Sequence, residues 1–97
     1  MRARGSGIRH GQEQIDYWEF NEAFAAQVIG CNREFKIRED KINAVGSGIG
    51  LGHPVGATGA RLIITMINEL KRRGAKYGCA SLCAASGPAH AFIVESL

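Results

Sequence analysis

The stretch that decides the fold is Gly46-Ser47-Gly48-Ile49-Gly50-Leu51-Gly52-His53-Pro54-Val55-Gly56-Ala57-Thr58-Gly59, with six glycines in fourteen residues. This glycine density predicts a loop without regular structure, because glycine permits positive φ and close backbone approach. The stretch has neither the Gly-Lys-Ser/Thr ending of a P-loop nor the G-x-G-x-x-G spacing of a dinucleotide site. A lone histidine is usually a satisfied polar side chain. Here Gly52 and Pro54 fix its backbone and leave it sterically open, as a general base or oxyanion donor requires.

The segments around this loop alternate between strand and helix patterns. Aromatic and apolar residues alternate with polar ones over 15–20, which predicts a short strand, and residues 42–45 suit a further extended segment. Apolar residues recur at helical spacing over 22–34, and Asn21, just before them, is a good N-cap. A second helix is predicted over 55–73, with Gly74 as the residue that ends it. Residues 76–83 and 89–95 predict a terminal antiparallel hairpin. The order predicts an α/β fold with helices covering a sheet.

Length, composition and charge exclude several protein classes. The 97 residues allow one domain, and 45% hydrophobic residues are ordinary for a globular protein. No apolar run is long enough to cross a bilayer, so no membrane partner is expected. Arg2, Arg4 and Arg9 carry the whole net charge of +3, because nine basic and nine acidic residues remain without them. We therefore expect no nucleic-acid partner, a loose segment over 1–14 and a single unit over 15–97.

The cysteines indicate free thiols in a reducing compartment. Cys31, Cys79 and Cys83 are an odd number, and the first residues contain no apolar signal-peptide core. Cys79 and Cys83 lie four apart in an apolar run without a second ligand pair, so no metal site is expected. Each cysteine, taken alone, is best explained as a small buried apolar side chain.

Three motifs together resemble the C-terminal domain of the thiolases, the acetyl-CoA C-acyltransferases. They are Asn21-Glu22-Ala23-Phe24, then Gly50 to Arg61 with its Gly-His-Pro core, then Leu82-Cys83 followed by small residues. Their order and spacing match the family from about Ile15 to Leu97. The resemblance implies a thiolase-like C-terminal half-domain, incomplete here, with a mixed sheet and covering helices.

The resemblance also implies a reaction and a role for each motif. Thiolases exchange acyl groups between coenzyme A and a 3-ketoacyl-CoA through an acyl-cysteine. The residue matching His53 activates the nucleophile and helps form an oxyanion hole, and the one matching Asn21 holds a water of that hole. Cys83 matches the acid/base thiol, and Phe24 would line the substrate pocket. Fixed donors aimed at the enolate oxygen and a thiol that shuttles protons suit this chemistry.

Three departures from the family pattern matter. The nucleophilic cysteine belongs to the family's N-terminal domain, and neither Cys31 nor Cys79 lies in a matching motif. The family has Cys-x-Gly-x-Gly where this chain has Ala85 at the first glycine, whose backbone N–H belongs to a second oxyanion hole. An alanine there costs on the order of 1 kcal/mol if the position needs positive φ. The family also has Asn-Val-Asn-Gly where Val45 replaces the second asparagine.

The leading hypothesis is therefore thiolase-type acyl transfer, carried as a C-terminal fragment that is inactive alone. The alternatives are a non-enzymatic remnant, a small module that binds coenzyme A or acyl groups, and, more weakly, a related ketoacyl synthase. The expected substrate is an acyl-CoA, with coenzyme A as substrate and no permanently bound cofactor. The expected partner is a thiolase N-terminal domain or another thiolase subunit, in a homo-oligomer. We expect a cytoplasmic protein, with a mitochondrial or peroxisomal one as the alternatives, and one uncovered sheet edge and helix face.

Overall fold

The computed structural model of the protein describes residues 2–4 and 11–97. Within them the chain forms four strands, three α-helices and two 3-10 turns. In chain order these are β1 (Arg2–Arg4), η1 (Gln12–Gln14), β2 (Tyr17–Phe20), α1 (Ala25–Phe35), η2 (Glu39–Lys41), α2 (Gly48–Leu51), α3 (Thr58–Arg73), β3 (Tyr77–Cys83) and β4 (Ala89–Glu95).

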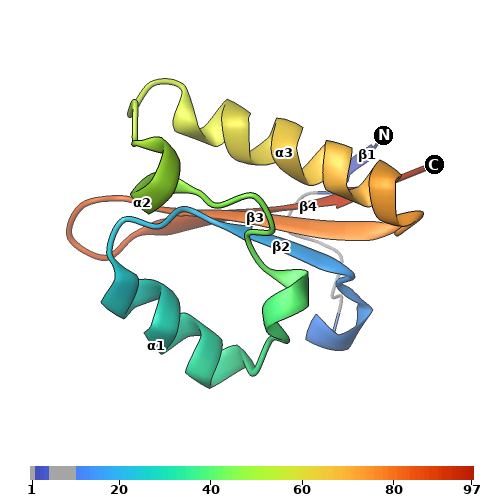
Figure 1. Ribbon diagram of the computed structural model, residues 1–97, viewed down its shortest axis with the longest axis horizontal. Helices are drawn as coiled ribbons and strands as arrows, with labels where there is room; N and C mark the ends of the chain where they lie inside the picture. The colour runs from blue at the N-terminus through green and yellow to red at the C-terminus, as the bar shows by residue number, and fades with distance from the viewer. Residues whose placement is uncertain (1, 5–10) are drawn as a thin grey trace.

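The strands form one mixed sheet in the order β1-β4-β3-β2. β2 runs parallel to β3, whereas β4 is antiparallel to both β3 and β1. The expected hairpin is confirmed, with Tyr77 opposite Glu95 and Cys83 opposite Ala89. Figure 1 shows α3 and α2 over one face of the sheet and α1 with η2 over the other. The predicted α/β class, with helices covering a mixed sheet, is therefore confirmed.

Two apolar clusters hold these layers together, one on each face of the sheet. Successive residues of a strand point to opposite faces, so the strands contribute to both clusters. The cluster beneath α3 contains Tyr17, Leu62, Met66, Leu70, Ala80 and Val94. The opposite cluster contains Ile15, Trp18, Phe20 and Cys79. Helix α1 has no fully buried residue, so its contribution to this core is small.

The outer edge of β2 is closed by one asparagine side chain. The amide Nδ2 of Asn43 donates to the Phe20 carbonyl (3.0 Å), and its Oδ1 accepts from the Phe20 N–H (2.8 Å). The amide thus makes both bonds that a neighbouring strand would make, and only Ile42 forms a β-bridge, to Trp18. The extended segment expected over 42–45 is reduced to this short contact.

Three local expectations need correction. The helix predicted over 22–34 begins at Ala25, and its N-cap position is Phe24 rather than Asn21. Asn21 continues β2 instead, because its N–H donates to the Ser81 carbonyl at 2.9 Å. The glycine stretch contains the single helical turn α2.

The segment over 1–14, which we expected to be loose, contains β1 and η1. Residues 1 and 5–10 lie outside the described part of the chain.

Glu19 is a buried carboxyl beneath α3 whose ionisation opposes folding. Burial raises its pKa to about 7, with further contributions from the charges of Glu22 and Glu69. The Tyr17 hydroxyl donates a hydrogen bond to it, and Arg61 lies near enough to attract its charge, so both lower this pKa. The pKa of Glu69 is instead lowered to about 2 by hydrogen bonds from Arg72 and Arg73.

The unfolding free energy should therefore fall as pH rises from 4.5, the ordinary value, to about 7. In this window the folded protein binds the Glu19 proton that the unfolded chain has lost, so higher pH favours unfolding. The fall should be on the order of 3 kcal/mol at most, and Glu19→Gln should abolish it in urea unfolding at pH 5 and 7. The contribution of Glu69 is complete above pH 4.5, so Glu69→Gln should lower stability at both pH values and leave the slope unchanged. An unchanged slope in Glu19→Gln would contradict the assignment.

Candidate functional site

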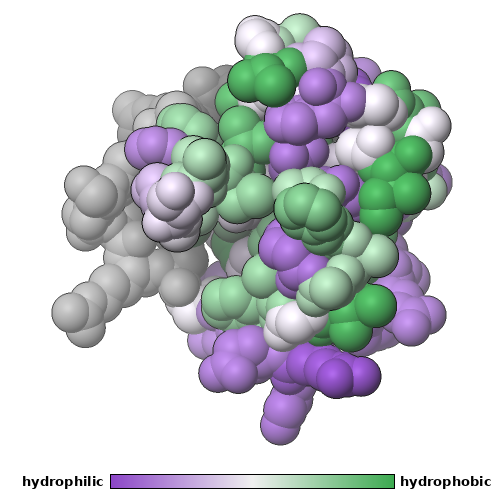
Figure 2. Space-filling model, turned by 90° about the vertical axis from the view of Figure 1, so that its left-hand side faces the viewer, coloured by the Kyte–Doolittle hydropathy of each residue, from purple (hydrophilic) through white to green (hydrophobic). Residues whose placement is uncertain are grey.

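The expected site residues gather at one end of the sheet. Parallel strands β2 and β3 end at the same edge, so Asn21, which follows β2, lies at the same end as Cys83, which closes β3. The loop between α2 and α3, which carries His53, lies at this end in Figure 1. Figure 2 shows this end face-on, with apolar side chains spread across it and polar ones between them.

The side-chain amide of Asn21 is buried without a hydrogen-bond partner among the described residues. Asn21 is 2% exposed, and within residues 2–4 and 11–97 neither its Oδ1 nor its Nδ2 makes a hydrogen bond. Helix α2 lies directly on it, since a Cβ on Gly48 would be 3.2 Å from the Asn21 Oδ1 and 2.9 Å from the Glu22 carbonyl oxygen. A buried amide left unpaired costs about 1–3 kcal/mol. Buried polar groups without partners are rare in folded proteins and call for a specific explanation, such as a bound water.

Glu22 ties the glycine stretch to the end of β2. Its Oε2 accepts from the backbone N–H of Ser47 (3.2 Å) and Ile49 (3.0 Å), at the start of α2. Its Oε1 accepts from Asn43 Nδ2 at 3.2 Å. The carboxylate therefore satisfies N–H groups that a helix start leaves unpaired, which explains why a turn forms in so glycine-rich a stretch.

His53 is exposed, and among the described residues only one of its ring nitrogens has a hydrogen-bond partner. Its Nδ1 lies 2.7 Å from the hydroxyl of Thr58, the first residue of α3. Thr58 is completely buried. Arg61 Nη1 donates to the Gly52 carbonyl at 2.8 Å, which fixes the backbone just before the histidine. The loop is thus anchored on both sides of an open imidazole.

The three thiols differ in environment. Cys83 is exposed at the end of β3, whereas Cys79 is buried in the sheet. Burial raises the pKa of Cys79 to about 11, so that thiol stays protonated at neutral pH. Cys31 is partly buried on α1, with Gln27 Nε2 3.8 Å from its sulfur. Cys83 is therefore the thiol best placed to meet a ligand.

In the turn after Cys83, the residues with positive φ are Ser86 and Gly87, and Ala85 is not one of them. The Ala84 N–H donates to the Pro88 carbonyl at 2.8 Å and closes the turn. Ser86 has a φ of 67° and Gly87 a φ of 113°, whereas Ala85 is not among the residues with positive φ. The glycine-to-alanine departure at Ala85 therefore carries no left-handed strain.

Glycine substitutions in this turn should consequently have opposite effects. Ser86→Gly should raise the unfolding free energy by up to ~1 kcal/mol, because a non-glycine residue at left-handed φ costs about 1–2 kcal/mol. Ala85→Gly should lower it by about 0.4–1 kcal/mol through the added entropy of the unfolded chain. Urea unfolding of the two single variants measures both signs. Stabilisation by Ala85→Gly would mean that this position is the strained one.

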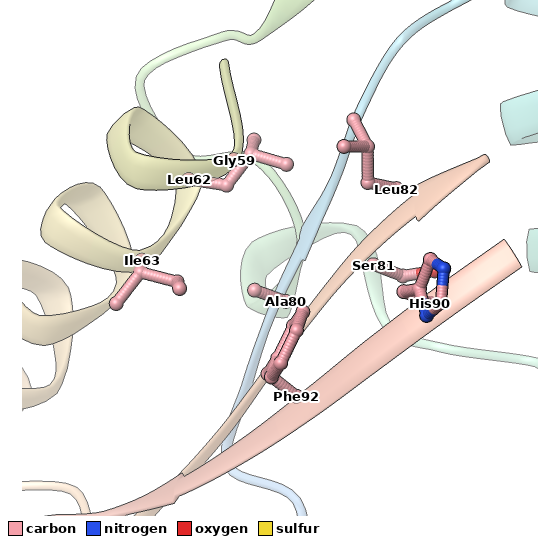
Figure 3. A pocket seen from close by; sticks show the side chains of 8 residues that line it. All are labelled: Gly59, Leu62, Ile63, Ala80, Ser81, Leu82, His90 and Phe92. Carbon is pink, nitrogen blue, oxygen red and sulfur yellow. The ribbon is translucent and has the colours of Figure 1, made fainter. Parts of the chain in front are cut away.

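Phe24 does not line the cavity that lies nearest to the site residues. Phe24 is 75% exposed and is not among the residues that line the cavity in Figure 3. That cavity, of about 240 Å³, lies between α3 and the β3–β4 hairpin. It is lined by Gly59, Leu62, Ile63, Ala80, Ser81, Leu82, His90 and Phe92. It begins beside the site, since Leu82 precedes Cys83 and Gly59 follows Thr58.

The structure thus brings Asn21, His53 and Cys83 to one end of the sheet, but no hydrogen bond joins their side chains within the described residues. Sequence patterns missed the groups that hold this arrangement, namely Glu22, Asn43 and Thr58. All three lie in stretches that were compared with the family motifs, and this was the signal that could have been used. Within residues 2–4 and 11–97, no group of three or more His, Cys, Asp or Glu side chains could hold a metal ion. No helix among them combines the length and apolarity that a membrane span needs.

Comparisons with known proteins show the family of this chain. The family model of the thiolase C-terminal domain matches residues 5–96. An acetyl-CoA acetyltransferase of Chromobacterium violaceum is 48% identical over 83 residues, which are 86% of this chain and 21% of that protein. The peroxisomal 3-ketoacyl-CoA thiolase B of Mus musculus is 48% identical over 82 residues, 84% of this chain and 19% of that protein. The chain therefore spans about a fifth of the length of the curated relatives it matches.

A solved structure gives the same result for the fold. The crystal structure of human mitochondrial 3-ketoacyl-CoA thiolase superposes with a TM-score of 0.86 at 38% identity, over 90% of this chain and 22% of that one. The family match extends ten residues further towards the N-terminus than the motifs suggested and so takes in part of the segment before residue 15. Fold, motifs and comparisons agree, and the chain belongs to the thiolase family, in which it corresponds to the C-terminal domain.

Proposed function

We propose that this chain supplies the C-terminal half of a thiolase active site. The reaction converts a 3-ketoacyl-CoA and coenzyme A into an acyl-CoA shortened by two carbons and acetyl-CoA. The supporting observation is the unpaired, buried amide of Asn21 at the end of the sheet that also carries exposed His53 and Cys83. No structural role among the described residues explains the Asn21 side chain, which caps no helix and makes no hydrogen bond to them.

The residue types suit the steps of this reaction. The His53 imidazole takes the proton of the nucleophilic thiol and then donates towards the thioester oxygen. The Asn21 amide holds a water that gives a second donor to the same oxygen. The Cys83 thiol exchanges a proton with the α-carbon and with the leaving thiol. Coenzyme A takes part as a substrate, and the chain needs no resident cofactor for these steps.

The nucleophile comes from a thiolase N-terminal domain or another thiolase subunit, because no cysteine of these 97 residues lies in a nucleophile motif. The site end offers an apolar surface for such a partner. Its large exposed apolar side chains include those of Phe24, Ile49, Leu51 and Val55. Exposed apolar patches of this kind mark protein interfaces. The assembled enzyme is a homo-oligomer, and since relatives include peroxisomal and bacterial thiolases, the cytoplasm is one of several possible compartments.

The purified chain alone should therefore show no thiolase activity, because no acyl-cysteine can form without the nucleophile. Mixed or fused with the Chromobacterium relative lacking its own C-terminal domain, it should restore cleavage of acetoacetyl-CoA by coenzyme A. The matched control is the same mixture with Cys83→Ser, which should remain inactive. Turnover by the isolated chain that disappears with Cys83→Ser would place the nucleophile within these residues. A stable complex without turnover would instead favour a non-enzymatic remnant.

A further inference from the structure

Among the described residues, the His53 ring has one hydrogen-bond partner, the Thr58 hydroxyl. The Nδ1 to Oγ1 distance is 2.7 Å, and Thr58 is fully buried. Among the described residues, Nε2 has no hydrogen-bond partner and stays available to a ligand. A neutral imidazole carries one proton, and the partner of one nitrogen decides which nitrogen holds it.

The Thr58 hydroxyl has a second neighbour, the Pro54 carbonyl, which also accepts from the Ala57 N–H at 2.8 Å. Oγ1 lies 3.1 Å from the carbonyl oxygen of Pro54, four residues earlier, and donates to it. The Thr58 N–H donates to the same oxygen at 2.9 Å. Threonine side chains commonly bond in this way to the carbonyl four residues back. When that proton points at Pro54, Oγ1 accepts from His53 and Nδ1 carries the hydrogen.

We propose that Thr58 is a positioning residue that fixes the Nδ1–H tautomer of His53 and leaves the lone pair on Nε2, the open nitrogen. This places the basic nitrogen where a substrate or an incoming thiol could reach it. When Nε2 takes up a proton, the bonds from Nδ1 to Thr58 and from Thr58 to Pro54 remain unchanged. The imidazolium therefore forms without rearranging a buried group. The consequence for acyl transfer rests on the proposed function, whereas the tautomer is a property of this chain alone.

The tautomer can be measured by nitrogen-15 NMR of the histidine rings in the full 97-residue chain at a pH where the rings are neutral. His53→Gln identifies the His53 signals against those of the other two histidines. The wild-type protein and Thr58→Ser should both show protonated Nδ1. Thr58→Val, which keeps the shape and removes the hydroxyl, should reduce the Nδ1–H fraction at least several-fold. Protonated Nε2 in the wild type, or an unchanged ratio in Thr58→Val, would overturn the proposal.

Two further arms keep the test decisive. If Thr58→Val does not fold, the wild-type and Thr58→Ser spectra still decide between the two tautomers. In the complex with the thiolase partner, Thr58→Val should lower kcat at least ~10-fold with little change in KM, and Thr58→Ser should restore it. Equal kcat in Thr58→Val would contradict a positioning role in catalysis. A complex without turnover for any variant would count against the proposed function and leave the tautomer result standing.

Discussion

Replacing His53 by alanine should reduce acyl transfer in the assembled complex by at least ~10²–10⁴-fold, the usual value of general acid–base catalysis. The loss should be larger still if the same ring also donates to the oxyanion, since one such donor is worth ~10²–10³-fold. The fold should survive, because the ring is exposed and bonds only to Thr58. The measurements are kcat for cleavage of acetoacetyl-CoA and the rate of acyl-enzyme formation in a single turnover.

The matched control is His90→Ala, which removes another exposed histidine, one that lines the cavity from β4 and pairs with Leu82 instead of lying in the loop before α3. That variant should keep the turnover of the parent complex. Near-normal acyl-enzyme formation in His53→Ala would demote His53 to a structural loop residue. Equal losses in both histidine variants would indicate damage to the complex rather than to its chemistry.

Residue patterns predicted most of the fold because most elements here depend on local signals. Residues 76–83 and 89–95 are apolar runs separated by turn-prone residues, and the structure forms the same strands within one residue. The helix expected over 55–73 forms from Thr58, with Gly74 in the left-handed conformation at its C-cap, as expected. Residues close together in the sequence specify such elements, so a sequence pattern is enough to predict them.

The errors occur where a distant partner outweighs a local preference. Asn21 has the composition of an N-cap, yet its backbone pairs with Ser81, sixty residues later, and so continues the strand. Glu22 suits a first helical turn, yet its carboxylate bonds to Ser47 and Ile49. A capping side chain stabilises a helix by about 1 kcal/mol, which a few long-range hydrogen bonds can exceed. Only a three-dimensional arrangement reveals such competitors.

The candidate site divides in the same way. Asn21, His53 and Cys83 were identified from family motifs, and the topology accounts for their common position, because two parallel strands end at one edge. Thr58 and Asn43 were missed because their roles depend on hydrogen-bond geometry rather than on residue spacing. Motif comparison left open whether Ala85 needs positive φ, because it fixes residue identities and says nothing about φ, which is positive at Ser86 and not at Ala85.

The largest effect on stability should come from Gly78→Ala in β3. A Cβ at this position would lie 2.6 Å from Met66 Cγ, 2.7 Å from its sulfur and 3.0 Å from Leu70 Cδ1. Met66 and Leu70 belong to α3, and both side chains are completely buried between that helix and the sheet. An added methyl group therefore forces the helix away from the sheet or these side chains out of their preferred rotamers. Overpacking of this kind costs about 1–3 kcal/mol. For a domain of this size the loss corresponds to a fall in Tm of roughly 4–20 °C.

Gly30→Ala is the matched control, because it adds the same methyl group at a helix position where that group meets no other atom. Gly30 lies within α1, and no atom stands within 4 Å of the added Cβ. Gly30→Ala should therefore raise the unfolding free energy by about 0.5–1 kcal/mol, through the lower backbone entropy of the unfolded chain. Thermal and urea unfolding of the two variants should give opposite signs. A neutral Gly78→Ala would mean that α3 packs less tightly on β3 than these distances indicate. It would contradict the explanation that glycine is needed at this position because the helix lies so close to the sheet.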